Sequence, residues 1–256
     1  MRAERQAARR AAAAARRRQR NLIIASVMGV ALIALGAIIL ASKLGDGGTT
    51  SIDAKGKETP SATPAKTLPP GTCEYKAGKP DAARKVELPP PTGVETKQAF
   101  TAHITTNLGV IDIQLNSAVA PCTANNFRSL AHFKYFDKTP CHRLTTQGIY
   151  VLQCGDPTGK GTGGPGYTFA DENLEDAKYP KGTVAMANSG PGTNGSQFFL
   201  VYKETQLDPN YTPFGTITKG LEIIDKVAAA GSAPTGDGKP KLSINILGIR
   251  IEPTKA

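Results

Sequence analysis

The sequence predicts a mainly β domain with antiparallel strands, which follows a single transmembrane helix and a disordered linker. Three observations support this: an uncharged apolar run at residues 22–41, a stretch rich in Pro, Gly and Thr after it, and about eight short strand-like runs with only two helical ones from residue 99 onward. Strands joined by hairpin-length turns, with few β–α–β units, favour an antiparallel barrel or sandwich. The 256 residues allow one to two domains.

The first segment, residues 1–21, is strongly basic. Residues 1–20 contain eight Arg and one Glu, which account for seven of the ten net positive charges of the chain. Because this charge lies directly before an apolar run, attraction to anionic lipid explains it more simply than a nucleic-acid interface. No nucleic-acid partner is therefore expected.

Residues 22–41 are predicted to span the cell membrane. They contain no charged residue, and twenty helical residues cover about 30 Å, the thickness of the hydrocarbon core. The basic tail should stay cytoplasmic and the rest of the chain should lie outside the cytoplasm. A cleaved signal peptide is the alternative, but the apolar run is too long and Ala41-Ser42-Lys43 is a poor cleavage site.

Residues 42–98 are predicted to link the anchor to a domain at residues 99–256. The segment 43–71 has few apolar residues and several prolines, so it is interpreted as a disordered stalk. The segment 72–98 is left open between stalk and packed chain, because it contains Cys73 and Tyr75, which a spacer does not need.

The domain begins with a predicted strand pair and a helix. Residues 101–106 and 110–115 flank a turn at 107–109, and the second run alternates apolar and polar residues as a half-buried strand does. Pro121 suits the first turn of a helix, and Phe127, Leu130 and Ala131 form its apolar face. The following strands are predicted at 141–145, 149–153, 183–187, 197–202 and 214–218, with a second helix at 220–227 and one closing strand made up of 242–247 and 249–251.

Four cysteines lie in the part of the chain placed outside the cytoplasm, where disulfides form. Cys141 and Cys154 lie on neighbouring predicted strands, and we expect them to pair. The remaining two, Cys73 and Cys122, would then tie the base of the stalk to the first helix. Four buried thiols are the alternative.

Several chemical motifs are absent or lack their context. The Gly-x-Gly-x-x-Gly pattern at residues 159–164 is followed by Pro165 and Gly166 where a dinucleotide site needs a helix, so a surface loop is favoured. His103, His132 and His142 have no partner at metal-ligand spacing, and there is no Cys-x-x-Cys. The sequence contains no nucleophile elbow either. No metal and no cofactor are expected.

Two other stretches suggest a binding site. Residues 186–201 combine a turn rich in Gly at 190–195, which lets the backbone approach a ligand, with Gln197 in an apolar strand. A hairpin that happens to contain glycines is the simpler alternative. Residues 140–156 place Arg143 and Gln153 among apolar neighbours. A buried arginine needs a reason, and ion pairing is the usual one.

Together these stretches resemble the cyclophilin family of peptidyl-prolyl isomerases over about residues 100–252. The matching motifs are Pro-Cys-Thr-Ala-Asn-Asn-Phe at 121–127, His-Arg at 142–143, Gln-Cys-Gly-Asp at 153–156, Asp-Glu-Asn at 171–173, Met-Ala-Asn at 186–188, Asn-Gly-Ser-Gln-Phe-Phe at 194–199 and Phe-Gly at 214–215. The order of anchor, linker and Cys-containing domain is similar to that of bacterial envelope cyclophilins.

The resemblance implies an eight-stranded closed antiparallel β-barrel capped by two α-helices, with a catalytic groove on its outer face. By motif position, the catalytic set would be Arg143, Gln153, Asn188 and Gln197. The substrate-binding set would be Tyr150, Val151, Ala187, Ser189, Thr193, Phe199, Leu207 and Tyr211. Gln153, Ala187, Asn188 and Gln197 would hold the peptide backbone, and Ser189 and Thr193 would edge a second pocket beside the proline pocket.

The chain also departs from the family pattern. Family members usually have Phe and Met where Tyr150 and Val151 stand, and often Trp and His at Gln206 and Tyr211. The two extra residues in 144–149 make the alignment after Arg143 less direct. The missing Trp implies that cyclosporin binding, if present, is weak.

The expected activity is isomerisation of X-Pro bonds in proteins outside the cytoplasm. Rotation about the amide crosses a barrier of about 18–20 kcal/mol, and a fixed guanidinium can stabilise the twisted state without a nucleophile or a catalytic carboxylate nearby. The alternatives are a proline-peptide binding module or chaperone with weak or no turnover, and a structural envelope protein with an inactive site.

Overall fold

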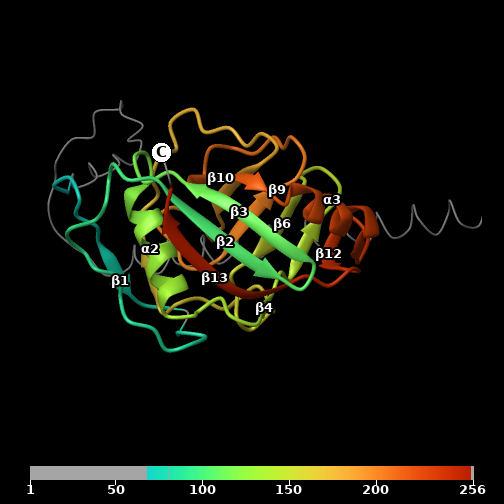
Figure 1. Ribbon diagram of the computed structural model, residues 1–256, viewed down its shortest axis with the longest axis horizontal. Coiled ribbons are helices and arrows are strands. Elements are labelled where there is room, and N and C mark those ends of the chain that lie inside the picture. Colours follow the sequence, from blue (N-terminus) through green and yellow to red (C-terminus); the bar gives the residue numbers. More distant parts are fainter. Residues whose placement is uncertain (1–67, 80, 255–256) are drawn as a thin grey trace, which may run out of the picture. The chain divides into compact units, whose positions relative to one another are not determined.

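The computed structural model describes residues 68–79 and 81–254 (Figure 1). The predicted anchor at 22–41, the basic tail and most of the predicted stalk lie outside this range. Among the described residues, no helix is long and apolar enough to cross a membrane.

The domain is mainly β, and its strands are antiparallel. The main sheet has eleven strands in the order β11 (Ser232–Ala233), β12 (Asp237–Pro240), β5 (Arg143–Thr145), β6 (Val151–Cys154), β9 (Phe198–Val201), β8 (Thr183–Met186), β10 (Pro213–Lys219), β3 (Gly109–Leu115), β2 (Phe100–Thr106), β13 (Asn245–Pro253) and β4 (Thr139–Pro140). A separate pair is formed by β1 (Tyr75–Ala77) and β7 (Tyr167–Phe169).

The main sheet curls into an antiparallel half-barrel (Figure 1). Only two residues separate β4 from β5, so the chain passes directly from the β13 side of the sheet to the β6 side. The expected closed barrel of eight strands is therefore met in part, because the described sheet has eleven strands and no pairing joins its edge strands β11 and β4. The strands β4, β11 and β12 have two to four residues and contain Pro or Gly in two of the three, too little pattern for prediction from sequence.

Both predicted helices are present, as α2 (Pro121–His132) and α3 (Leu221–Ala230). The first turn of α2 is stabilised by Glu172, whose carboxylate accepts hydrogen bonds from the backbone N–H of Cys122 and Thr123 at 3.0 and 2.7 Å. Helix α2 packs beside β13, and α3 lies near β3 and β12 (Figure 1).

Side chains on β6, β8 and β9 alternate between two buried layers. Leu152 and Leu200 point into the main core, which also contains the aromatic rings of α2 and the strands around it. Val151 and Phe199 point to the opposite face and pack in a second cluster with Tyr179. These strands are therefore buried on both faces, and the second cluster forms the floor of the site described below.

Both expected disulfides are confirmed, Cys73–Cys122 and Cys141–Cys154. The first joins the segment before the main sheet to α2. In the same segment, the Tyr75 hydroxyl donates to the Cys122 carbonyl at 2.8 Å, and β1 pairs with β7. The described part of residues 72–98 therefore packs against the domain, which decides the alternative that the sequence left open.

Candidate active site

The outer face of β6, β8 and β9 carries two adjoining cavities. The smaller has a volume of about 120 Å³ and is lined by Arg143, Ile149, Val151, Gln153, Ala187, Asn188, Phe199, Leu207 and Tyr211. The larger, of about 350 Å³, is lined mainly by the glycine loop at 161–165 and by residues 187–189, 193 and 195–197. Gln153, Ala187 and Asn188 line both, so the cavities form one groove.

Most of the predicted site residues meet in this groove. Val151, Ala187, Phe199, Leu207 and Tyr211 form the apolar wall of the smaller cavity, as expected for a proline pocket. Ser189 and Thr193 line the larger cavity, as expected for its neighbour.

The aromatic wall of the smaller cavity is fixed by mutual contacts. The rings of Phe199 and Tyr211 meet edge to face with centroids 5.6 Å apart. The Tyr179 hydroxyl donates to the Tyr211 carbonyl at 2.8 Å and accepts from the Tyr211 N–H at 3.1 Å. The loop that carries Tyr211 is thereby tied to the second cluster, so its ring forms a rigid wall.

Tyr150 does not line the pocket, and its predicted place there is wrong. Its ring contacts Tyr202, with centroids 6.1 Å apart, and the Lys203 ammonium group at 4.4 Å. Ile149 lines the pocket instead. Alternation explains this result, because Ile149 and Val151 share one face of the chain and Tyr150 lies on the other. The sequence signal was available in the two extra residues between Arg143 and Gln153, which make motif position unreliable there.

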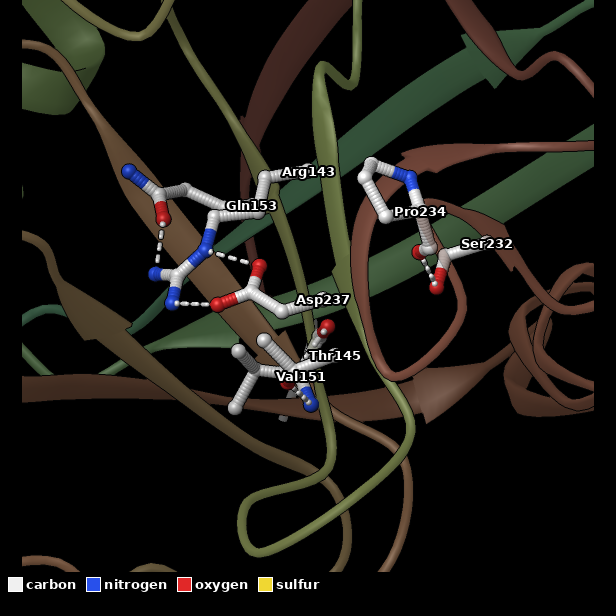
Figure 2. Close-up of polar contacts among 7 residues, drawn as sticks. All are labelled: Arg143, Thr145, Val151, Gln153, Ser232, Pro234 and Asp237. Atoms are coloured by element: carbon white, nitrogen blue, oxygen red, sulfur yellow. Dashed lines mark hydrogen bonds and ion pairs between the residues drawn. The ribbon is translucent and has the colours of Figure 1, made fainter. Parts of the chain in front are cut away.

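Arg143 lies at the edge of the pocket and makes three hydrogen bonds (Figure 2). Its Nη1 donates to Gln153 Oε1 at 3.2 Å, while Nε and Nη2 donate to the two oxygens of Asp237, each at 2.7 Å. This ion pair agrees with the expectation that ion pairing accounts for an arginine among apolar neighbours, and Asp237 is the partner. Hydrogen bonding to Asp237 raises the pKa of Arg143 above the usual value for arginine, so the guanidinium is permanently charged.

Gln153 and Gln197 form a relay from Arg143 to the glycine loop. Gln153 accepts from Arg143 and donates its Nε2 to Gln197 Oε1 at 2.8 Å. Gln197 Nε2 in turn donates to the carbonyl groups of Gly161 and Gly163, at 3.0 and 2.9 Å. Both donor hydrogens of the Gln197 amide are thus used inside the protein. Its expected contact with a peptide backbone stays a prediction, whereas its role in holding the loop is direct.

The Asn188 side chain is also engaged with the protein. Its Nδ2 donates to the Asn210 carbonyl at 2.7 Å, and its Oδ1 accepts from the Gly190 N–H at 3.2 Å. These bonds join the 188–193 rim to the loop that carries Tyr211. Ala187 and Asn188 line both cavities and therefore lie where the two adjoin.

Residues 161–164 of the glycine-rich segment 159–164 line the larger cavity, although the sequence indicated only a surface loop. The segment is held by Asp156, which was not predicted as a site residue. The Asp156 carboxylate accepts hydrogen bonds from the N–H of Thr158, Lys160 and Gly161, at 2.7, 3.2 and 2.7 Å. The position of Asp156 at the end of the Gln-Cys-Gly-Asp motif was the available signal.

Comparisons with known proteins agree with this geometry. A family model described as cyclophilin type peptidyl-prolyl cis-trans isomerase/CLD matches residues 101–251. A probable peptidyl-prolyl cis-trans isomerase B of Mycobacterium leprae is 47% identical over 196 residues, covering 70% of this chain and 66% of the relative. Its counterpart in Mycobacterium tuberculosis is 46% identical and is covered to 64%, so the matched part spans about two thirds of these relatives.

Solved structures show the same fold. A cyclophilin-type peptidyl-prolyl cis-trans isomerase of Cryptosporidium parvum has a TM-score of 0.55 and 33% sequence identity, covering 61% of this chain and 99% of that structure. A second structure of the same protein, obtained in the presence of the dipeptide Ala-Pro, has a TM-score of 0.54 and 34% identity and covers 60% of this chain.

Proposed function

Because the chain belongs to the cyclophilin-type peptidyl-prolyl cis-trans isomerase family, we propose that its domain catalyses rotation about X-Pro peptide bonds in polypeptide substrates. The observation that carries this proposal is the position of Arg143 at the edge of a small apolar pocket on the outer face of the sheet. The pocket is suited to a proline ring, and the guanidinium would then lie beside the amide of that proline.

The reaction needs no bond to be broken. The barrier of about 18–20 kcal/mol arises from amide resonance, which is lost as the bond twists and the proline nitrogen becomes pyramidal. The walls formed by Val151, Phe199 and Tyr211 hold the ring still while the other half of the amide turns. N–H groups of Arg143 donate to the nitrogen or to the neighbouring carbonyl, and this interaction is stronger in the twisted state than in the planar one.

The substrate is proposed to lie along both cavities. A solved relative was crystallised in the presence of Ala-Pro, and we infer that a proline of the substrate of this chain enters the smaller cavity. The residues before the proline would then cross Ala187 and Asn188 toward the glycine loop of the larger cavity. The larger cavity is lined mainly by Gly and by small polar residues, which favours acceptance of several residue types before the proline.

Turnover of the full-length chain on an X-Pro peptide, followed by NMR exchange or a protease-coupled assay, tests the proposal. We expect Arg143→Ala to lower kcat/KM by about 10²-fold, the typical loss of one preorganised donor. Arg250→Ala is the matched control, because this arginine lies on β13 and its side chain is mostly exposed. Equal rates in wild type and Arg143→Ala would contradict the mechanism, and peptide binding without turnover would favour a binding module.

We further propose that the enzyme is anchored in the cell membrane by residues 22–41, with its tail in the cytoplasm and its domain outside. The support is the uncharged run behind a cluster of arginines, together with two disulfides in the domain, which suit an oxidising compartment. Folding of proline-containing proteins on that side of the membrane would be its task. Protease treatment of intact spheroplasts should digest the domain, and full protection of the domain would refute this topology.

A further inference from the structure

The arginine of the proposed mechanism is held by a strand that the mechanism does not use. Asp237 is the first residue of β12, and the pairing of β12 with β5 places it opposite Thr145. From there its carboxylate accepts from Nε and Nη2 of Arg143, each at 2.7 Å (Figure 2). Two parallel hydrogen bonds fix the plane of a guanidinium, which a single contact leaves free to turn.

The backbone around Asp237 is tightly held. The Gly236 carbonyl accepts from the Thr146 N–H at 2.8 Å. A Cβ atom at Gly238 would lie 2.4 Å from the carbonyl carbon of Ala233, so the two arms of the β11–β12 hairpin are in contact there. The Ser232 hydroxyl donates to the Pro234 carbonyl at 2.8 Å and closes the turn (Figure 2). Asp237 therefore projects from a backbone that is fixed on both sides.

The strand that carries Arg143 is equally fixed, and it is joined to the pocket. Thr145 Oγ1 accepts from the Val151 N–H at 3.1 Å (Figure 2). The Thr145 carbonyl accepts from the Tyr202 hydroxyl at 2.6 Å. Val151 lines the apolar cavity. The Thr145–Val151 hydrogen bond ties β5 to the pocket wall, and the pairing of β5 with β12 ties it to the strand of Asp237.

Some N–H groups of Arg143 remain free to donate to a substrate. A guanidinium has five N–H groups. Asp237 takes one from Nε and one from Nη2, and Gln153 takes one from Nη1 at 3.2 Å. One N–H remains on Nη1 and one on Nη2. The two acceptors therefore leave only the terminal nitrogens of Arg143 with spare donors.

We propose that Asp237 is a positioning residue of the isomerase, which orients Arg143 so that these two remaining N–H groups face the proline amide. This inference rests on the proposed function. The side chains of Arg143 and Asp237 are 41% and 55% exposed, and half-exposed ion pairs add little to stability. The two-point contact therefore serves the orientation of the arginine more than the folding of the domain.

Steady-state kinetics of the full chain on an uncharged X-Pro peptide test the proposal. We expect Asp237→Asn and Asp237→Ala to lower kcat by about 10-fold with little change in KM, since misplacement by 1 Å can cost about 10²-fold. An uncharged peptide is needed because Lys160 and Lys239 line a further cavity that Arg143 and Asp237 also line, and they would attract an acidic peptide. Asp225→Asn is the matched control, because Asp225 forms a similar ion pair with Lys181, at 2.9 Å and with exposures of 46% and 47%.

A double-mutant comparison distinguishes positioning from a general structural effect. If Asp237 acts through Arg143, adding Asp237→Asn to Arg143→Ala should cause no further loss of kcat. Unchanged kcat in both Asp237 variants, a similar loss in Asp225→Asn, or a full additional loss in the double variant would each overturn the proposal.

A second readout does not depend on turnover. The Arg143 Nε–H signal in a ¹H–¹⁵N spectrum, assigned by its absence in Arg143→Lys, should be sharp and slow to exchange in the wild type and should lose this protection in Asp237→Asn. An unprotected wild-type signal would overturn the positioning role even if the enzyme is active. An inactive wild type with a protected signal would instead refute the isomerase function and leave the orientation of Arg143 by Asp237 established.

Discussion

Single side chains enter or leave the groove according to the alternation of the chain that carries them. Ile149 and Val151 face the pocket, and Tyr150 between them turns toward Tyr202 and Lys203. Motif position alone placed Tyr150 in the pocket, because a resemblance aligns residues by order and does not follow the extra turn at 146–149. The pocket of this chain therefore has an aliphatic residue where an aromatic one was expected.

Because Ile149 lines the pocket and Tyr150 does not, substitutions at these two positions should have different effects. We expect Ile149→Ala to lower kcat/KM for an X-Pro peptide by about 10-fold, because it removes apolar contact with the proline ring. Tyr150→Leu should leave kcat/KM unchanged and lower the free energy of unfolding by about 1 kcal/mol, through lost contact with Tyr202. Kinetics and chemical denaturation of both variants check this, and a larger kinetic loss in Tyr150→Leu would contradict the assignment.

Residue roles were predictable for side chains that lie in a recognisable motif, and not for a side chain that lies outside every motif. The sequence placed Arg143, Gln153 and Gln197 in one site, and their relay is present. It did not predict Asp237, which lies 94 positions from Arg143 in a strand too short and too rich in Gly and Pro to be recognised. The expectation of an ion pair was correct, although Arg143 is partly exposed and not buried, and the sequence offered no way to choose its partner.

At the scale of structural elements, the glycine loop at 159–164 is held by hydrogen bonds to the buried Asp156 carboxylate and not by a helix or strand. Asp156 lies fully inside the loop, where a Cβ at Gly163 would come within 2.0 Å of its Oδ1. Glycine is therefore required at 163 by space, in addition to any freedom of the backbone. The regular elements were predictable where an apolar or alternating run marks them, which includes the short β5, β6, β8 and β9, whereas β1, β7, β11 and β12 carry no such run and were not predicted.

Protonation of Asp156 should loosen this loop. Burial opposes ionisation of its carboxyl, but hydrogen bonds from Thr158, Gly161 and Gly163 outweigh burial and lower the pKa of Asp156 below the usual value of 3.8. A group with a depressed folded pKa contributes stability that is present above the unfolded value and is lost as the pH falls through the folded one.

The free energy of unfolding of the wild type should therefore decline as the pH falls below about 3.8, in part through Asp156. In Asp156→Asn this part of the decline should be absent, and stability near pH 7 should be lower by about 1–3 kcal/mol, because an amide cannot satisfy four converging donors. Asp81→Asn, at an exposed carboxylate, is the control. Parallel pH profiles for wild type and Asp156→Asn in urea denaturation would contradict the prediction.

For the described domain as a whole, the two disulfides act on different parts of the molecule. Cys73–Cys122 closes a segment of 49 positions and ties the chain before the main sheet to α2, and neither cysteine lines the groove. Cys141–Cys154 spans 13 positions and joins a residue two positions before Arg143 to the residue directly after Gln153. Their pairing was predictable because strand assignments brought Cys141 and Cys154 together and left one remaining pair. The sequence predicted an antiparallel barrel or sandwich but not how far the sheet closes, because the short edge strands carry no pattern of their own.

Removing the two disulfides should separate stability from catalysis. In the chain-entropy description, loss of the longer link by Cys73→Ser/Cys122→Ser should lower the free energy of unfolding by about 4 kcal/mol, and loss of the shorter link by Cys141→Ser/Cys154→Ser by about 3 kcal/mol. Only the second pair should also lower kcat, because it frees the strands that hold Arg143 and Gln153 opposite each other. Denaturation and kinetics below the unfolding transition measure both effects. If the first pair reduces kcat as much as the second, the groove depends on the whole domain rather than on the β5–β6 clamp.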